Sequence, residues 1–155
     1  AEVTLIDLRD FPMPLFDGDL ERDQGMPEHG ARLKKLMSEH DGFLLACPEY
    51  NSSITAVMKN AIDWASRPNP KEAFHGKTAL LLSASPGGLG GLRGLVTVRS
   101  ILGNIGVLVL PEQLAVNKAT EAFDESGGLK DAAQLATIDR LVHRLVEVTG
   151  KLVGS

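Results

Sequence analysis

One helical repeat of apolar positions stands out in the first half of the chain. Its members are Ile54, Val57, Met58, Ala61, Ile62 and Ala65, which recur at intervals of three and four residues. That spacing places them on one face of an α-helix, and Pro68 ends the helix near Arg67. Directly before it, the apolar run 42–47 is short enough for a buried strand. The pattern therefore predicts a strand, a loop and a helix in succession.

Similar patterns predict the other elements and an alternating order of strands and helices. Helical spacing predicts an amphipathic helix over 27–39, a helix from about Leu92 to 105, and a long terminal helix with Leu135, Ile138, Leu141, Val142, Leu145, Val148 and Leu152 on one face. β-forming residues predict strands over 1–8, 78–83 and 107–110, the last continued by 114–116. Two prolines make 11–17 a loop. This order favours an α/β domain with a parallel sheet.

Trp64 widens the apolar face of the helix over 54–65. One interpretation is that the whole face packs on the sheet of its own domain. The alternative is that Trp64 and Met58 also face a second subunit.

The loop 48–53, Pro-Glu-Tyr-Asn-Ser-Ser, is the first candidate site. It follows the carboxyl end of a strand, where open α/β sheets bind ligands. Pro48 ends the strand sharply, so that loop amides could face a ligand. Tyr50 could offer an apolar face, and Asn51 both donors and acceptors. Alternatively, this is an ordinary polar loop whose Asn and Ser residues cap the next helix. The residue types alone leave both interpretations open.

A resemblance to a known family favours the first interpretation. Residues 48–52, followed by Lys59-Asn60-Ala61-Ile62-Asp63-Trp64 and Ser66-Arg67-Pro68, resemble the signature of the NAD(P)H-dependent FMN reductase family. Thr55-Ala56 departs from it, because the family often has Pro-Gly there. That family includes quinone, azo-dye and chromate reductases. The resemblance implies a single flavodoxin-like domain over 1–155, a three-layer α/β/α fold with a parallel sheet.

The glycine-rich segment 84–91 is the second candidate loop. It fails the dinucleotide fingerprint, since Arg93 stands where a third glycine is needed. Glycine-rich turns at helix N-termini can cradle anions, but these glycines could instead only permit tight packing. The resemblance implies that this is the family's second flavin loop, with Ser85 in contact with FMN. It also implies that Arg93, which could bind a phosphate, belongs to a subunit interface.

The resemblance implies an FMN-dependent oxidoreductase that passes reducing equivalents from NAD(P)H to a quinone, an azo compound or a similar acceptor. FMN would be the cofactor and NAD(P)H the co-substrate, and hydride transfer to the flavin demands no protein acid or base. The residues expected to bind the cofactor are Pro48, Glu49, Tyr50, Asn51, Ser52, Ser85, Pro86 and Gly87. Two alternatives are a flavodoxin-type FMN electron carrier, which usually has a far more acidic surface, and a flavin-free regulatory or scaffold protein.

Composition narrows the partners and the compartment. The 155 residues carry a net charge of −4 and no basic stripe, which disfavours nucleic acid and acidic membranes as partners. No apolar run reaches the length of a membrane span. The only cysteine, Cys47, cannot form an internal disulfide, which suits the cytoplasm, and we interpret it as a small core residue. With the resemblance, these features predict a cytoplasmic homodimer or homotetramer with a small-molecule acceptor.

No metal site is expected. The four histidines are scattered without a ligand spacing. The acidic residues Asp17, Asp19, Glu21 and Asp23 lack the pattern of a calcium loop, so we interpret them as a solvated rim.

The resemblance also implies an earlier strand, phosphate loop and helix that the 155 residues do not contain. Either these residues are part of a longer protein or the protein lacks its phosphate loop. We expect the first, because loss of that strand would leave an edge unpaired in the middle of a parallel sheet.

Overall fold

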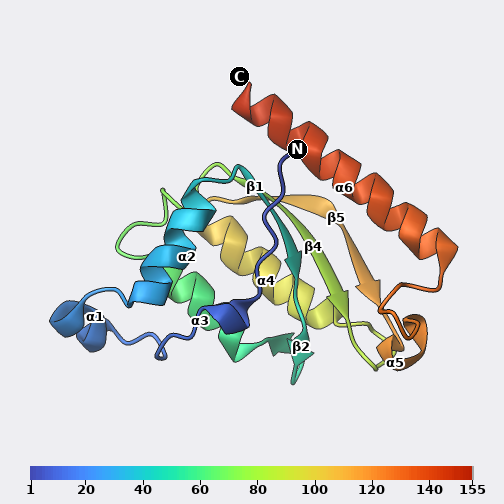
Figure 1. The fold of residues 1–155 in the computed structure, drawn as a ribbon, viewed down its shortest axis with the longest axis horizontal. Coiled ribbons are helices and arrows are strands. Elements are labelled where there is room, and N and C mark those ends of the chain that lie inside the picture. Colours follow the sequence, from blue (N-terminus) through green and yellow to red (C-terminus); the bar gives the residue numbers. More distant parts are fainter. Residues whose placement is uncertain (155) are drawn as a thin grey trace.

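The computed structural model of the chain describes residues 1–154, and its centre is a parallel sheet of three strands (Figure 1). The strands are β1 (Gly42–Ala46), β4 (Thr78–Ala84) and β5 (Leu108–Val116), in the order β1-β4-β5. β4 pairs in parallel with both neighbours. The predicted parallel sheet is therefore confirmed.

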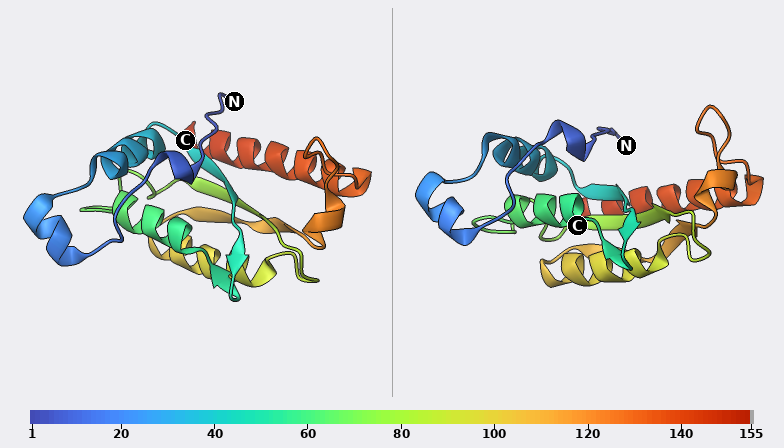
Figure 2. Two further views of the ribbon diagram at one scale, coloured as in Figure 1. Left: turned by 60° about the horizontal axis from the view of Figure 1, so that its bottom comes forward. Right: turned by 90° about the horizontal axis from the view of Figure 1, so that it is seen from below.

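Alternating side chains of β4 divide the core into two layers. Ala79 and Leu81 belong to the core cluster with α3 (Ala56–Ala65) and α4 (Leu92–Asn104). Leu80 packs instead with residues of α6 (Ala132–Val153). Figure 2 shows α4 and α6 on opposite sides of the strands. This two-sided burial makes the predicted three-layer α/β/α arrangement.

The remaining elements are short or peripheral. α2 (Glu28–Ser38) packs beside α3 through Leu33 and Ala61. The other elements are η1 (Leu8–Asp10), α1 (Gly18–Gln24), β2 (Glu49–Tyr50), β3 (Ser53–Ile54) and α5 (Ala119–Ala122). β5 runs on through Pro111, where its pairing with β4 is interrupted by a register shift. The two strand segments predicted for this region are thus one irregular edge strand, a position that tolerates proline.

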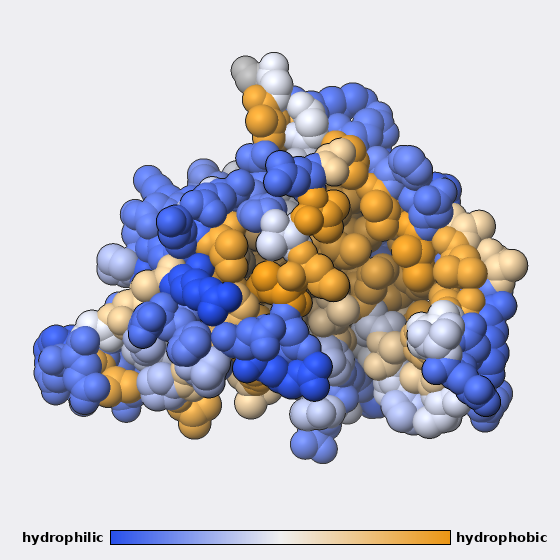
Figure 3. Space-filling model, viewed as in Figure 1, coloured by the Kyte–Doolittle hydropathy of each residue, from blue (hydrophilic) through white to orange (hydrophobic). Residues whose placement is uncertain are grey.

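The predicted strand over residues 1–8 is wrong. Residues 1–7 form no regular element, and Val3 and Leu5 are 83% and 95% exposed. A strand needs a neighbour for its backbone hydrogen bonds, and within residues 1–154 the outer edge of β1 has no strand beside it. A cleft of about 660 Å³, lined by residues 4–9, β1, α2 and α3, lies there instead. Figure 3 shows apolar side chains on this hollowed face.

Trp64 packs entirely within this chain. It is 0% exposed, and its indole N–H donates to the Pro14 carbonyl at 2.8 Å. Its ring meets that of Phe16 edge-on, with the centroids 5.0 Å apart. The residue therefore anchors the loop over 11–17, and the interpretation that Trp64 faces a second subunit is wrong. Met58 is partly buried against the same core as the sheet.

Candidate functional site

The first candidate loop is a tight β-hairpin at the carboxyl end of β1. β2 and β3 pair antiparallel, with Tyr50 opposite Ser53, so only Asn51 and Ser52 form the turn. Both have positive φ, 51° and 66°. Two such residues make the I′ geometry that matches the twist of a hairpin. The turn places the Asn51 and Ser52 side chains at the tip of the hairpin.

The helix after the hairpin, α3, is not capped by Asn51, Ser52 or Ser53. Thr55 is the N-cap of α3, and its Oγ1 accepts from the Met58 N–H at 3.3 Å. The interpretation in which Asn51 or its neighbouring serines cap the helix is therefore wrong. Within residues 1–154, the Asn51 carboxamide makes no hydrogen bond. Its donors and acceptor remain available to a ligand.

The second candidate loop divides into a packed part and an open part. Gly90 and Gly91 have φ of +63° and +91°, and a Cβ on either would lie within 3 Å of Val116 or Ser83 atoms. These glycines serve close packing. A Cβ on Gly88 would meet nothing within 4 Å. Tight packing thus explains the end of the loop but not its beginning.

Ser85, Pro86 and Gly87 form the open part, and β5 and the residues after it support them. The Ser85 N–H donates to the Val116 carbonyl at 3.1 Å, and the Ser85 carbonyl accepts from Ala119 at 3.0 Å. The Gly87 carbonyl accepts from Lys118 at 3.3 Å. Backbone hydrogen bonds to Val116, Lys118 and Ala119 thus fix this part of the loop, and all three of its residues stay partly or fully exposed.

Glu49 connects the two candidate loops. Its Oε2 accepts from the Gly94 N–H at 2.9 Å, in the first turn of α4, which follows the glycine-rich loop. Its Oε1 lies 3.5 Å from Nε of Arg93, while the Glu49 side chain is only 9% exposed. Arg93 therefore pairs within its own chain. No sequence pattern indicated this contact. The one available signal is that α4 begins at a glycine with no acid in its first turn.

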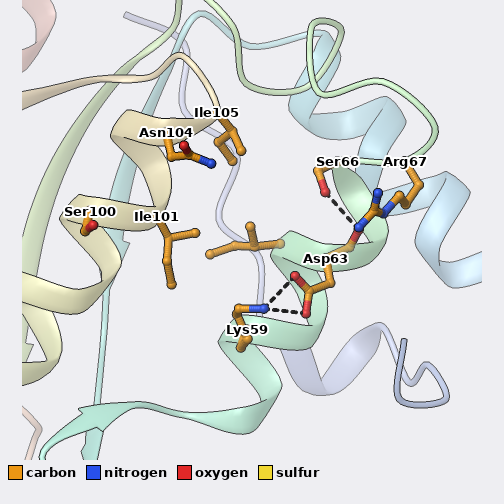
Figure 4. Close-up of a pocket in the computed structure, with 9 residues that line it drawn as sticks. Lys59, Asp63, Ser66, Arg67, Ser100, Ile101, Asn104 and Ile105 are labelled. Carbon is orange, nitrogen blue, oxygen red and sulfur yellow. Dashed lines mark hydrogen bonds and ion pairs between the residues drawn. The ribbon is translucent and has the colours of Figure 1, made fainter. Parts of the chain in front are cut away.

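Two cavities of the structure contain few of the residues predicted to bind the cofactor. The cleft beside β1 reaches Pro48 and Tyr50 of the first loop but no residue of the second. A pocket of about 420 Å³ between α3 and α4 contains none of the predicted cofactor residues (Figure 4). Of the charged residues that line it, Lys59 and Asp63 pair with each other at 2.8 Å. We therefore locate the candidate site at the two loops.

Other reactive groups lie apart from these loops or are inert. Cys47 is buried, and burial raises the pKa of its thiol to about 11. Asp17 caps α1, and Asp19 pairs with Arg22. In the described part of the chain, no three His, Cys, Asp or Glu side chains gather as a metal site. None of the helices in residues 1–154 is both long and apolar enough to cross a bilayer.

Comparisons with known proteins agree with this fold. Residues 1–121 match the family described as NADPH-dependent FMN reductase. An NAD(P)H-dependent FMN reductase of Pseudomonas aeruginosa is 39% identical over 120 residues, which are 77% of this chain and 64% of that relative. A quinone reductase of Escherichia coli K12 is 32% identical over 135 residues, 86% of this chain and 70% of the relative.

A solved structure is similar over almost the whole chain. FerB, a flavoenzyme NAD(P)H:(acceptor) oxidoreductase from Paracoccus denitrificans, superposes with a TM-score of 0.80 at 30% identity. The superposition covers 97% of this chain and 81% of FerB. The chain thus spans 64% of the first relative's length and more of FerB's. The family match and these similarities show that the chain belongs to the NADPH-dependent FMN reductase family.

Proposed function

We propose that this protein is an FMN-dependent oxidoreductase that passes reducing equivalents from NAD(P)H to a small-molecule acceptor such as a quinone or an azo compound. The observation that carries the proposal is the pair of loops at the carboxyl ends of β1 and β4, joined through Glu49. Ligands of open α/β sheets bind at such strand ends. The family membership supports the same reaction class.

The residues of the two loops fit a flat, polar ring system. The Asn51 carboxamide is available at the hairpin tip, and the backbone at Gly87 and Gly88 is open to close approach. Pro48, Glu49, Tyr50, Asn51 and Ser52 would border FMN on one side, and Ser85, Pro86 and Gly87 on the other. Bound FMN supplies the hydride and electron chemistry. The protein's own residues bind and orient it and leave one face open to the two substrates.

The proposal also includes the oligomeric state of the protein and the cell compartment in which it works. Exposed apolar residues on α3 and α4, such as Val57 at 52% and Val96 at 62%, support a homodimer or homotetramer. A single buried cysteine supports the cytoplasm. Sedimentation of the purified chain tests the first point, and a single monomer peak across concentrations would contradict it.

The test of the proposed site is a double substitution, Asn51→Ala with Ser85→Ala. Two lost hydrogen bonds weaken FMN binding by about fivefold to 150-fold, since each contributes about 0.5–1.5 kcal/mol. The matched control is Asn104→Ala with Ser100→Ala, two exposed residues of α4 that line the pocket in Figure 4. Flavin absorbance and fluorescence titrations measure both variants. Equal FMN affinity in the site variant and the wild type would remove Asn51 and Ser85 from the site.

Steady-state oxidation of NADPH with a quinone tests the reaction itself. A reductase turns over NADPH when both substrates and FMN are present. A protein that binds FMN without oxidising NADPH is an electron carrier, and that result would refute the proposed reaction but not the flavin site.

A further inference from the structure

The N-terminus of α4 receives its cap from another element. An α-helix begins with backbone N–H groups that have no partner inside the helix. The N-cap residue usually supplies an acceptor, but here it is Gly91, with a left-handed backbone and no side-chain cap hydrogen bond. The first turn of α4 carries no acidic residue. The acceptor comes from Glu49, whose Oε2 lies 2.9 Å from the Gly94 nitrogen.

Two glycines at the start of α4 permit close packing, one against the hairpin and one against β4. A Cβ on Gly94 would lie 3.3 Å from the Ser53 carbonyl oxygen and 3.4 Å from Cβ of Glu49. A Cβ on Gly91 would lie 3.6 Å from Cβ of Glu49 and 2.9 Å from Oγ of Ser83. A side chain at Gly94 would require the hairpin to shift by a few tenths of an ångström, whereas one at Gly91 would clash with Ser83 of β4. The contact is therefore built from small residues around one carboxylate.

The end of the glycine-rich loop is held from both sides. Oγ of Ser83, at the end of β4, donates to the Gly90 carbonyl at 2.7 Å inside the protein. Glu49 holds the first turn of α4 from the hairpin side, and its 9% exposure keeps water from competing for the carboxylate. A carboxylate also interacts favourably with the positive end of the helix dipole. Hairpin and glycine-rich loop are thereby fixed relative to each other.

We propose that Glu49 is a positioning residue, which sets the distance between the two loops of the flavin site by capping α4 across the gap between them. The backbone of Glu49 borders the cofactor with the rest of its loop, while its carboxylate acts on the cofactor through the two loops and not by touching it. The choice of FMN as a probe rests on the proposed function, while the capping role does not. The variants Glu49→Ala and Glu49→Gln separate these roles, because glutamine keeps an oxygen that can accept from Gly94.

Hydrogen exchange of the FMN-free protein is the first measurement. In Glu49→Ala, exchange of the Gly94 amide and its neighbours in α4 accelerates by about tenfold or more, since a charge-assisted hydrogen bond is lost. In Glu49→Gln, which keeps a neutral acceptor, we expect a smaller acceleration than in Glu49→Ala. The matched control is Glu147→Ala, which removes an exposed glutamate that pairs with Arg144 and Lys151 on α6. It should leave α4 unchanged.

FMN titration of the same variants is the second measurement. Glu49→Ala weakens FMN affinity about fivefold or more, because fewer molecules hold both loops in the binding geometry. Glu49→Gln restores most of the affinity. If both variants lose affinity equally while protection of Gly94 stays at the wild-type level, the carboxylate contacts the cofactor and the positioning role is wrong. Unchanged affinity and unchanged exchange in Glu49→Ala would also overturn it.

If Glu49→Ala does not fold, a second variant tests the same proposal. Gly94→Ala keeps the Glu49 carboxylate in the protein but requires the hairpin to shift from α4 by a few tenths of an ångström, and it should weaken FMN binding in the same direction. Normal affinity in Gly94→Ala would refute the dependence on loop spacing. If neither this chain nor a longer protein that contains it binds FMN, the proposed function fails, and exchange at Gly94 still decides whether Glu49 caps α4.

Discussion

Two glycines of the glycine-rich loop lie in opposite environments, and we expect opposite effects of an alanine substitution on the free energy of unfolding. Gly90 has a φ of +63°, and an ideal Cβ there would lie 2.7 Å from the carbonyl carbon of Val116 and 2.8 Å from that of Ala115. Both neighbours are backbone atoms of β5, which cannot rotate away. Gly88 has no positive φ and an open environment. Alanine should therefore be costly at the first position and tolerated at the second.

The magnitude follows from two effects at Gly90. A left-handed backbone costs an alanine about 1–2 kcal/mol, and overpacking costs about 1–3 kcal/mol. Gly90→Ala is thus expected to lower the free energy of unfolding by about 2–5 kcal/mol. Gly88→Ala should change it by less than about 1 kcal/mol, in either direction. Its effect should appear in FMN affinity instead, because a methyl group would occupy the space open to a ligand.

Urea denaturation followed by far-UV circular dichroism measures both variants without FMN. With a slope of about 1–3 kcal/mol per molar urea, Gly90→Ala should lower the midpoint by about 1 M or more. A Gly90→Ala protein as stable as the wild type would refute the packing argument. Equal destabilisation by both variants would show that the loop responds to any side chain, contrary to the division into a packed and an open part.

Three further predictions concern single side chains. Thr55→Ala removes the cap of α3 and should destabilise the fold by about 1 kcal/mol, with Thr55→Ser close to wild type in the same urea experiment. Trp64→Phe removes the indole donor to Pro14 and part of a fully buried ring, so it should lower the free energy of unfolding by about 0.5–1.5 kcal/mol for the hydrogen bond and further for the cavity it leaves; no change would contradict both contributions. The Cys47 thiol, with a pKa raised by burial to about 11, should resist alkylation at pH 8 until urea unfolds the protein. Its raised pKa also means that stability falls as the pH rises from about 9, the ordinary value, through 11, and rapid native alkylation would contradict this burial.

Elements whose pattern reflects their own local burial were predicted well. The helix over 54–65 shows its apolar spacing because Ala61, Ile62 and Ala65 lie against the core. Val57 belongs to the same stripe but is 52% exposed, since it lines the cleft beside β1. The apolar stripe thus predicted correctly which face of the helix turns inward. It did not predict how much of that face other residues cover.

Features that depend on a distant partner could not be read from the sequence. Residues 1–8 have the composition of a strand, yet strand formation requires a neighbouring backbone that no local pattern encodes. The Asn51-Ser52 turn lacks the glycine that usually marks an I′ hairpin, so it was predicted only as a loop. The contact between Glu49 and Gly94 depends on which helix lies opposite the hairpin. The sequence thus predicted the position of the two candidate loops at strand ends, but not the contact that connects them.

The two edge strands of the sheet, β1 and β5, differ in how readily a further strand could pair with them. β5 is interrupted at Pro111, and Arg99 donates to the Leu110 carbonyl at 2.6 Å, both of which hinder another strand from pairing there. β1 has neither a proline nor a charged residue over Gly42–Ala46. Of the two edges, β1 is therefore the one at which an extended segment, of the same molecule or another, can pair. Because β1 leads directly into Pro48 and the hairpin, such an addition would stiffen one wall of the proposed flavin site, and strand pairing would be coupled to cofactor affinity.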